Sequence, residues 1–540
     1  MSFDRAAGVR RLAAEPFDVV VIGGGITGAG CALDAASRGL RTALVERDDF
    51  ASGTSSKSSK LVHGGLRYLQ QREIRLVYEA LAERQVLRRT APHLVRVLPF
   101  LLPVFTSDGL INRKLARALG SAMWMYDVTG GLRIGKLHRR ISKDAALAHM
   151  PTLRASRLAS AYIYYDARAD DARLTLTIAR TAAEQGAAIA NRATVAGFEK
   201  DGSGRVNGVH VRVDGETILV RARTVVNATG VWSDDVRALD EGTHPDSIRP
   251  AKGVHITVPW AKVRNDIAAV VPVRKDRRSV FVVPWGDFTY VGTTDTDYDG
   301  PLENPQCTPD DVEYLLRAIN DVVTTPISES DVLGTWAGLR PLVKRAGSER
   351  TADLSRRHSV TTSASGVVTV TGGKLTTYRR MAADAVDVVA RELDVKQRSR
   401  TTRVPLSGAA DWDARGLSDH LAGRFGSNGV AVRALETGQP ELAEPIVPGL
   451  AYSKAEVVYA AREEMARSVD DVLARRTRAR LLARDASAAA ASEVARLIAP
   501  IIGWTAEEQA ASIAEYHALV DKERTSAALP ETALDAALGT

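Results

Sequence analysis

Short apolar runs near the start of the chain are separated by a glycine-rich turn and an amphipathic stretch. The run from Val19 to Ile22 predicts a fully buried parallel strand. A helix is expected from Ile26 to about Ser37, and a second apolar strand from Thr42 to Val45. This strand–helix–strand order predicts a Rossmann-like α/β unit at the beginning of the chain.

The glycines after the first strand have the spacing G-x-G-x-x-G. Gly23 permits the tight turn, Gly25 lets a pyrophosphate approach the backbone, and Gly28 lets the helix pack closely on the strand. Glu46 ends the second strand, where its carboxylate can accept hydrogen bonds from an adenosine ribose. The agreement of strand, glycines, helix and acid predicts that the chain binds a dinucleotide.

Three regions far apart in the sequence are predicted to form one discontinuous nucleotide-binding domain: 16–71, 150–245 and 349–395. In the second region, an apolar strand from Thr224 ends in the glycine turn at Gly230. In the third, a strand is followed by Gly372 and Gly373 and by a helix beginning near Leu375. Several apolar strands that each end in a glycine turn are typical of a sheet that contacts its cofactor at more than one strand end.

The remaining segments differ from these regions in their predicted secondary structure. Residues from about 72 to 149 are expected to be helical and are rich in arginine, whereas 246–348 alternate like antiparallel strands. Together they are predicted to form a mainly antiparallel β substrate-binding domain. Residues 396–540 are predicted to form a helical C-terminal domain, with helical periodicity at 454–482 and 489–498.

Composition limits the classes of function. Hydrophobic residues make up 45% of the chain, and 72 Lys and Arg against 65 Asp and Glu give a net charge of +7. Aromatic residues are only 5% and the charge is diffuse, which argues against a nucleic-acid partner. No apolar stretch is long enough to span a membrane, no secretory signal is visible, and Cys31 and Cys307 support neither disulfides nor a metal site. We therefore expect a cytoplasmic protein.

Several longer segments resemble one enzyme family. The segment Ser58-Ser-Lys-Leu-Val-His-Gly-Gly-Leu-Arg-Tyr-Leu69 is similar to one that FAD-dependent glycerol-3-phosphate dehydrogenases carry just after their nucleotide fold. Residues 292–297, 334–342, 370–379 and 471–477 resemble further segments of that aerobic-type family, which lies within the D-amino-acid-oxidase-like flavoproteins. The resemblance extends over nearly the whole chain.

The resemblance implies FAD as the cofactor and oxidation of sn-glycerol 3-phosphate to dihydroxyacetone phosphate. A hydride leaves C2 for flavin N5 while the C2 hydroxyl gives its proton to a base. This chemistry needs an anion clamp, a general base, and positive charge near the flavin N1–C2=O edge.

The resemblance assigns these tasks to particular side chains. Arg340 and Arg356 match phosphate-contacting positions, where a planar guanidinium binds phosphate oxygens bidentately. His63 and His255 are the candidate bases, with the choice between them open, because histidine has an unperturbed pKa near working pH. Lys374 at a helix start would stabilise a reduced, anionic flavin and could assist the base.

Further residues are expected around the substrate and the cofactor. Arg67 and Tyr68 are predicted to line the substrate pocket. The serine-rich tract before Lys60 is expected to wrap the pyrophosphate and flavin with hydroxyls and amides. The full set of expected cofactor-binding residues is Gly23, Gly25, Gly28, Glu46, Ser59, Lys60, Leu61, Gly230, Gly372, Gly373, Lys374 and Leu375.

The electron acceptor has two candidates, quinone and oxygen. The basic segment 113–143 includes Met123, Trp124 and Tyr126, a composition suited to the anionic inner leaflet of the cytoplasmic membrane. We therefore expect peripheral membrane attachment and transfer to membrane quinone, with a homodimer as a candidate assembly. An oxidase that uses oxygen, and an amine or amino-acid oxidase on the same fold, are the alternatives.

Overall fold

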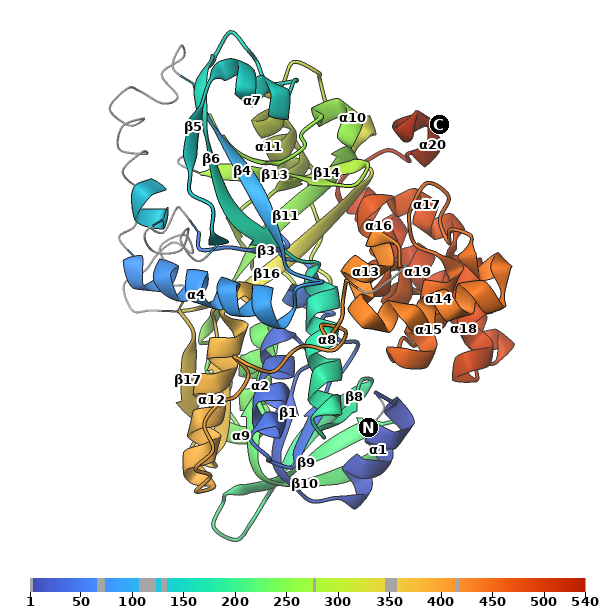
Figure 1. Cartoon of the computed structure of the whole chain (residues 1–540). Coiled ribbons are helices and arrows are strands. Elements are labelled where there is room, and N and C mark those ends of the chain that lie inside the picture. Colours follow the sequence, from blue (N-terminus) through green and yellow to red (C-terminus); the bar gives the residue numbers. More distant parts are fainter. Residues whose placement is uncertain are drawn as a thin grey trace.

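The computed structural model describes residues 3–65, 73–105, 123–127, 134–274, 278–344, 357–413 and 417–539. Within these residues the chain forms two large sheets and a separate group of helices. In Figure 1 the first sheet lies in the lower half of the molecule and the second in the upper half, while the C-terminal helices stand to one side of both.

The first sheet contains the predicted dinucleotide-binding unit. Its main strands, in spatial order, are β17 (Ser359–Thr362), β18 (Val367–Thr371), β10 (Glu216–Asn227), β1 (Phe17–Ile22), β2 (Thr42–Val45) and β7 (Ala188–Ala190). β8 (Ala193–Lys200) and β9 (Val206–Val213) extend the sheet from β10 in antiparallel fashion. The pairings among β18, β10, β1, β2 and β7 are parallel, as the continuous apolar runs predicted.

Both faces of this sheet are covered, which explains why its strands are apolar throughout. On one face Val19 and Val21 belong to a core that includes residues of α2 (Ile26–Ser37), α8 (Asp171–Glu184) and α12 (Tyr378–Glu392). On the other face Val20 and Ile22 pack with residues of β8, β9 and α1 (Arg5–Ala14). The helix α9 (Ser233–Glu241) follows β10. Alternate side chains of β1 thus enter different cores.

The second sheet is mainly antiparallel, as expected for a substrate-binding domain. Its strands are β15 (Thr296–Asp297), β11 (Ile248–Pro259), β14 (Phe288–Gly292), β13 (Ser279–Trp285), β12 (Ala268–Pro272), β4 (Arg96–Phe105), β6 (Leu158–Arg168) and β3 (Leu61–Val62), with β16 (Gly334–Val343) beside β11 and β5 (Arg139–Ile141) beside β6. The pairing of β12 with β4 is parallel. Helices α4 (Ile74–Thr90), α7 (Lys143–His149), α10 (Trp260–Val263) and α11 (Pro309–Asn320) accompany these strands.

Two expectations about chain organisation are wrong. The segment 72–149 is not helical throughout: after α4, residues Arg96–Phe105 form β4, whose Pro99 and Pro103 are incompatible with a helix interior. The boundary at residue 150 also fails to separate the two sheets. β6 lies beyond it and yet pairs with β4 along its length, because the backbone edge of β4 hydrogen-bonds to β6 in antiparallel register.

The C-terminal region is helical, as predicted. Its helices are α13 (Asp419–Phe425), α14 (Gly429–Gly438), α15 (Lys454–Glu463), α16 (Ala479–Leu482), α17 (Arg484–Ala489), α18 (Ala491–Ile502), α19 (Ala506–Ser526) and α20 (Leu534–Leu538). The expected helical stretch 454–482 is divided, because α15 ends before a π-helical turn at Asp471–Arg476. These helices share one hydrophobic core that also receives Phe288 and Leu333 from the substrate-binding region.

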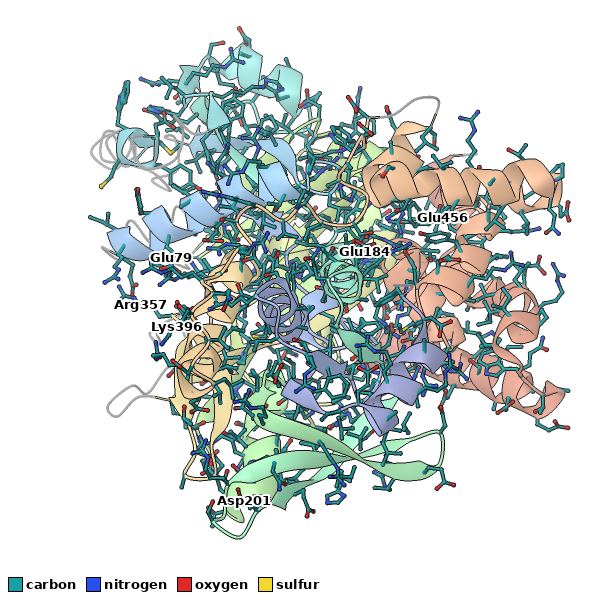
Figure 2. The ribbon with its side chains drawn as sticks, turned by 60° about the horizontal axis from the view of Figure 1, so that its bottom comes forward. Glu79, Glu184, Asp201, Arg357, Lys396 and Glu456 are labelled. Carbon is teal, nitrogen blue, oxygen red and sulfur yellow. The ribbon has the colours of Figure 1, made fainter. Side chains whose placement is uncertain are left out.

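Buried ion pairs join the C-terminal region to the first sheet. Asp49, which is fully buried, accepts hydrogen bonds from Arg475 (Nε, 2.6 Å) and Arg476 (2.8 and 2.9 Å). Figure 2 shows Glu184 of α8 between the first sheet's helices and the helical region that carries Glu456 on α15. Removing one partner of a buried pair leaves an uncompensated charge, so these contacts fix how the region docks.

No helix in the described ranges is long and apolar enough to cross a membrane. Most of the basic segment 113–143 lies outside those ranges. Of its aromatic residues, Trp124 is 59% exposed and Tyr126 is buried.

Candidate functional site

The glycine turn after β1 has the geometry that its spacing predicts. Gly23 has a φ of +105°, which L side chains rarely adopt. A Cβ on Gly28 would stand 1.9 Å from the Gly23 carbonyl oxygen, so only glycine allows α2 to lie this close to β1. Gly25 is the N-cap of α2, and the amide of Ile26 donates to Ser55 Oγ at 2.9 Å. The amino end of α2 therefore faces the site with its positive dipole end.

Glu46 stands beside this turn at the end of β2. Its carboxylate accepts hydrogen bonds from the backbone amides of Gly24 (2.5 Å) and Asp48 (2.8 Å). Burial raises the pKa of Glu46 to about 7, although these two hydrogen bonds oppose the shift. The side chain thus couples the glycine turn to the next loop and titrates near neutrality.

A cavity of about 610 Å³ extends from this turn to the second sheet. Such a volume is typical of a cofactor or ligand site. Thirteen of the expected site residues line it: Gly23, Gly25, Glu46, Ser59, Leu61, His63, Gly230, His255, Arg340, Gly372, Gly373, Lys374 and Leu375. The cavity therefore unites residues from all three regions of the discontinuous domain with residues from the antiparallel sheet.

Two expected cofactor residues do not line the cavity. Gly28 instead packs α2 against the turn, as its place in the motif predicts. Lys60 points away: its Nζ donates to Asp171 Oδ1 and to the Ser56 carbonyl oxygen, both at 3.0 Å. Burial lowers the pKa of Lys60 to about 8. Arg67, Tyr68 and Arg356 lie outside the described residues.

The double glycine after β18 forms another wall. Gly372 and Gly373 have φ values of +75° and +81°, and a Cβ on Gly373 would stand 2.3 Å from Met381 Sδ. Glycine is therefore required for the turn that presents Lys374 at the cavity. Lys374 precedes a short 3₁₀ turn (Leu375–Thr377) that leads directly into α12.

His255, on β11, is the most enclosed ionisable group at the cavity. Its ring stacks on Trp336 with centroids 4.7 Å apart and planes 7° from parallel. Its Nε2 lies 2.9 Å from Ser59 Oγ, whereas its Nδ1 is buried without a hydrogen-bond partner among the described residues. Burial, with Lys60 and Arg340 nearby, lowers the pKa of His255 well below the usual value. The imidazole is therefore neutral at working pH.

His63 also borders the cavity, in a different setting. It follows β3, and its backbone amide donates to Thr376 Oγ1 at 3.1 Å. Its ring meets the ring of Phe281 edge-on, with centroids 5.9 Å apart. His63 is thus tied both to the turn after Lys374 and to Phe281 on β13.

Arg340, on β16, is held by the loop after β14. Its guanidinium donates to Asp295 Oδ1 at 2.9 Å, to Thr293 Oγ1 at 3.2 Å and to the Thr294 carbonyl oxygen at 3.3 Å. Arg278 also lines the cavity, and it donates to the Asp295 carbonyl oxygen at 2.7 Å. The sequence analysis missed both Asp295 and Arg278. The segment 292–297 marked the loop, but nothing local indicated which side chains it would meet.

Comparison with known proteins places this arrangement in a family. Residues 18–379 match the model of the FAD dependent oxidoreductase family, and residues 399–509 match the C-terminal domain of alpha-glycerophosphate oxidase. The chain belongs to the FAD-dependent glycerol-3-phosphate dehydrogenase family. It is accordingly an FAD-dependent oxidoreductase, as the motifs of its sequence suggested.

Individual relatives support this assignment over the full chain. Glycerol-3-phosphate dehydrogenase 2 of Mycobacterium tuberculosis is 43% identical over 98% of this chain and 92% of its own length. The human mitochondrial glycerol-3-phosphate dehydrogenase is 38% identical over 90% of this chain and 71% of its own length. A glycerol-3-phosphate dehydrogenase from Bacillus halodurans, solved in complex with FAD, superposes with a TM-score of 0.77 at 30% identity and covers 95% of this chain and 96% of its own.

Proposed function

We propose that this enzyme oxidises sn-glycerol 3-phosphate to dihydroxyacetone phosphate and passes the electrons to membrane quinone. The observation that carries the proposal is the convergence of Arg340, Lys374 and a neutral His255 on the cavity that the glycine turn opens into. A small phosphorylated alcohol needs cations for its phosphate and a proton acceptor for its hydroxyl. Arg340 and Lys374 supply the cations, and His255 supplies the acceptor.

The shape of the cavity suits FAD along its length. In the proposal Glu46 holds the adenosine ribose, while Gly23, Gly25 and the start of α2 hold the pyrophosphate. Ser59, Leu61, Gly230 and the turn Gly372–Leu375 surround the flavin ring system. When bound, FAD supplies N5 as the acceptor of the hydride from C2.

The phosphate is assigned to Arg340, together with Arg356, Arg67 and Tyr68 of the segments that resemble the family's. Asp295 fixes the orientation of the Arg340 guanidinium, which lines the cavity. Lys374 is assigned to the flavin edge, where its ammonium and the neighbouring backbone amides offset negative charge on the reduced ring.

Of the two histidines, we assign the general base to His255. Its Nδ1 is buried, has no partner in the described structure and belongs to a ring that lines the cavity, so it can accept the C2 hydroxyl proton. A dianionic phosphate near Arg340 would offset one of the cations that hold the pKa of His255 low, so substrate binding itself strengthens the base. His63 lines the same cavity and is assigned to the substrate pocket.

The substrate assignment is tested by anaerobic titration of the purified flavoenzyme. Stoichiometric bleaching of the flavin absorbance by sn-glycerol 3-phosphate, and none by glycerol, is expected. Bleaching by an amino acid instead would favour the amine or amino-acid oxidase alternative on the same fold. Reduction by none of these compounds would overturn the proposed function.

The acceptor is inferred from an exposed apolar surface. The patch consists of Ile74 (48% exposed), Tyr78 (51%), Trp124 (59%) and Met125 (39%). Its two elements, α4 and the helical segment 123–127, share a buried cluster that includes Leu81 and Tyr126, so the two elements are packed together. Exposed apolar side chains on elements packed together beside a basic segment suit a membrane face, where quinone is available. We therefore propose peripheral attachment to the inner leaflet, with a homodimer as the candidate assembly.

The match of residues 399–509 to an oxidase domain favours oxygen as the second candidate acceptor. The two acceptors are distinguished by adding lipid vesicles that contain a quinone. We expect a variant with both Trp124→Ser and Met125→Gln to lose quinone reduction. The control variant Val430→Ser, which changes an exposed residue of α14, should keep it. Stoichiometric hydrogen peroxide without quinone reduction would replace this proposal with the oxidase.

A further inference from the structure

The segment 56–60 forms part of the cavity wall, yet it has little regular structure of its own. It lies between a short 3₁₀ turn (Thr54–Ser56) and β3, and its residues Lys57, Ser58 and Ser59 line the cavity. A loop that presents a catalytic contact must be held by its surroundings. The side chains that hold segment 56–60 come from α8 and the C-terminal helical region, and also from the antiparallel sheet, where Tyr290 donates to the Ser59 carbonyl oxygen at 2.9 Å.

Asp171, the first residue of α8, is the main anchor of this segment. Its carboxylate is fully buried, and Oδ2 accepts hydrogen bonds from the Ser58 amide (2.9 Å) and hydroxyl (2.7 Å). Its Oδ1 accepts from Lys60 Nζ at 3.0 Å. One carboxylate therefore fixes the residues on both sides of Ser59.

Arg478 brings the C-terminal region into the same cluster. This residue is 1% exposed and follows the π-helical turn. Its guanidinium donates to Asp171 Oδ1 at 2.6 Å and to the Ser56 carbonyl oxygen at 2.7 Å. The C-terminal region thus binds segment 56–60 directly and also binds the carboxylate that holds it.

The far end of this network is His255. Ser59 Oγ lies 2.9 Å from His255 Nε2, and the Ser58 carbonyl oxygen accepts from Trp336 Nε1 at 3.1 Å. Trp336 is the residue on which the His255 ring stacks. Both contacts that orient the imidazole therefore depend on where Ser58 and Ser59 are held.

We propose that Asp171 and Arg478 are positioning residues for His255, so that their contacts with segment 56–60 set the tautomer and orientation of the imidazole. With Ser59 held in place, its hydroxyl engages Nε2, and Nδ1 is the ring nitrogen without a partner among the described residues. The role in turnover rests on the proposed function, whereas the effect on the imidazole itself does not.

The test uses Asp171→Asn and Arg478→Gln in the full-length holoenzyme. Asparagine is nearly isosteric, but it cannot accept all of the hydrogen bonds that the carboxylate accepts. We expect kcat to fall about 10- to 100-fold with little change in KM, as misplacement of a reacting group does. Arg478→Lys should recover part of the loss, because it restores the charge with a single donor direction.

Imidazole ¹⁵N chemical shifts in histidine-labelled holoenzyme give a readout that does not require turnover. His255→Gln assigns the signal. Ser59→Ala removes the hydrogen bond to His255 Nε2 and leaves the hydrogen bonds between Ser58 and Asp171 intact. We expect Asp171→Asn, Arg478→Gln and Ser59→Ala to change the His255 tautomer in the same direction. An unchanged His255 signal in the first two variants would overturn the proposal, even if activity fell.

The matched control is Arg173→Gln. Arg173 lies on the same helix, is equally buried, and pairs with Glu464 and the Arg476 carbonyl oxygen across the same junction. It makes none of the contacts to segment 56–60. The control should lower thermal stability as the test variants do, while leaving the His255 signal and kcat as in the wild type. If the control changes them equally, general loosening explains the result and the proposal fails. Absence of flavin bleaching in the wild type would contradict only the proposed function.

Discussion

The Arg340 guanidinium lies 2.9 Å from the Asp295 carboxylate, and Arg278 donates to the backbone carbonyl of the same Asp295 at 2.7 Å. One loop residue after β14 therefore holds two arginines at the cavity wall. The Asp295 side chain is only 7% exposed and that of Arg340 is 26% exposed, so the pair is partly open on the arginine side. An anion can approach the guanidinium while the carboxylate keeps its plane fixed.

The first prediction concerns Arg340. Arg340→Ala should raise KM for sn-glycerol 3-phosphate about 10- to 150-fold, because a charge-assisted hydrogen bond contributes about 1.5–3 kcal/mol. Arg340→Lys should give an intermediate value, since an ammonium keeps the charge without the planar pair of donors. Steady-state kinetics over a wide substrate range measures both.

A matched control for this change is Arg249→Ala. Arg249 also lies on the antiparallel sheet and pairs with an aspartate, Asp297, at 2.7 Å, but it does not line the cavity. The KM of the Arg249→Ala variant should stay within about twofold of the wild-type value, as expected for a partly exposed ion pair. Equal effects of the two substitutions would remove Arg340 from the phosphate site.

The glycine turn and Glu46 could be predicted from the sequence because their signal is local. Strand, turn and helix are contiguous, and each glycine answers a steric need within a few residues. β4 could not be predicted locally because Arg96–Phe105 is a nearly continuous apolar run with two prolines and lacks the alternation of apolar and polar residues that marks an antiparallel strand. Its partner β6 is distant in the sequence, and only that pairing reveals β4.

Residues whose partners are distant in the sequence could not be predicted from local sequence patterns. Asp171, Asp295 and Arg478 are ordinary charged residues in the sequence, and their meaning comes from partners remote along the chain. Lys60 shows the opposite error. The sequence groups it with its neighbours in the cavity wall, but Lys60 has a left-handed φ of +56°, and its side chain faces Asp171 instead.

The second prediction is the pH dependence of His255. Because burial and the cations of Lys60 and Arg340 hold the pKa of His255 well below its usual value, the imidazole stays neutral where an ordinary histidine would gain a proton. The pH profile of kcat/KM, which reports the ionisable groups of the free enzyme, should therefore stay level from pH 8 to about 6 and fall only at lower pH. A midpoint near the ordinary histidine pKa would contradict the assignment.

The third prediction separates the two histidines. His255→Asn should lower kcat about 100- to 10,000-fold, which is the usual contribution of a general base. His63→Asn should act mainly on KM, because His63 lines the cavity but is not assigned the C2 hydroxyl proton. A larger loss of kcat from His63→Asn than from His255→Asn would reverse the two roles.

The fourth prediction concerns Gly28. In Gly28→Ala the new methyl would meet the Gly23 carbonyl oxygen at 1.9 Å, so α2 must move away from β1. We expect purified protein with little bound FAD and a lower melting temperature. Gly197→Ala is the control, since a Cβ there meets nothing within 4 Å. Normal flavin content in Gly28→Ala would show that close packing of α2 is not needed for binding.

The last prediction is that FAD affinity increases with pH through neutrality. Burial raises the pKa of Glu46 to about 7, so below that pH the carboxyl is mostly protonated in the apoprotein. Ribose hydroxyls donate to the ionised form more strongly, so FAD binding should favour loss of the proton. The Kd for FAD, measured by flavin fluorescence, should therefore fall between pH 6 and pH 8. Glu46→Gln should bind FAD more weakly and with little pH dependence.

Asp18→Asn is the control, because it changes a carboxylate that does not line the cavity. Burial opposes the shift, but hydrogen bonds donated by Arg41 lower the pKa of Asp18. A Kd that does not change with pH in the wild type would show that Glu46 does not titrate on binding.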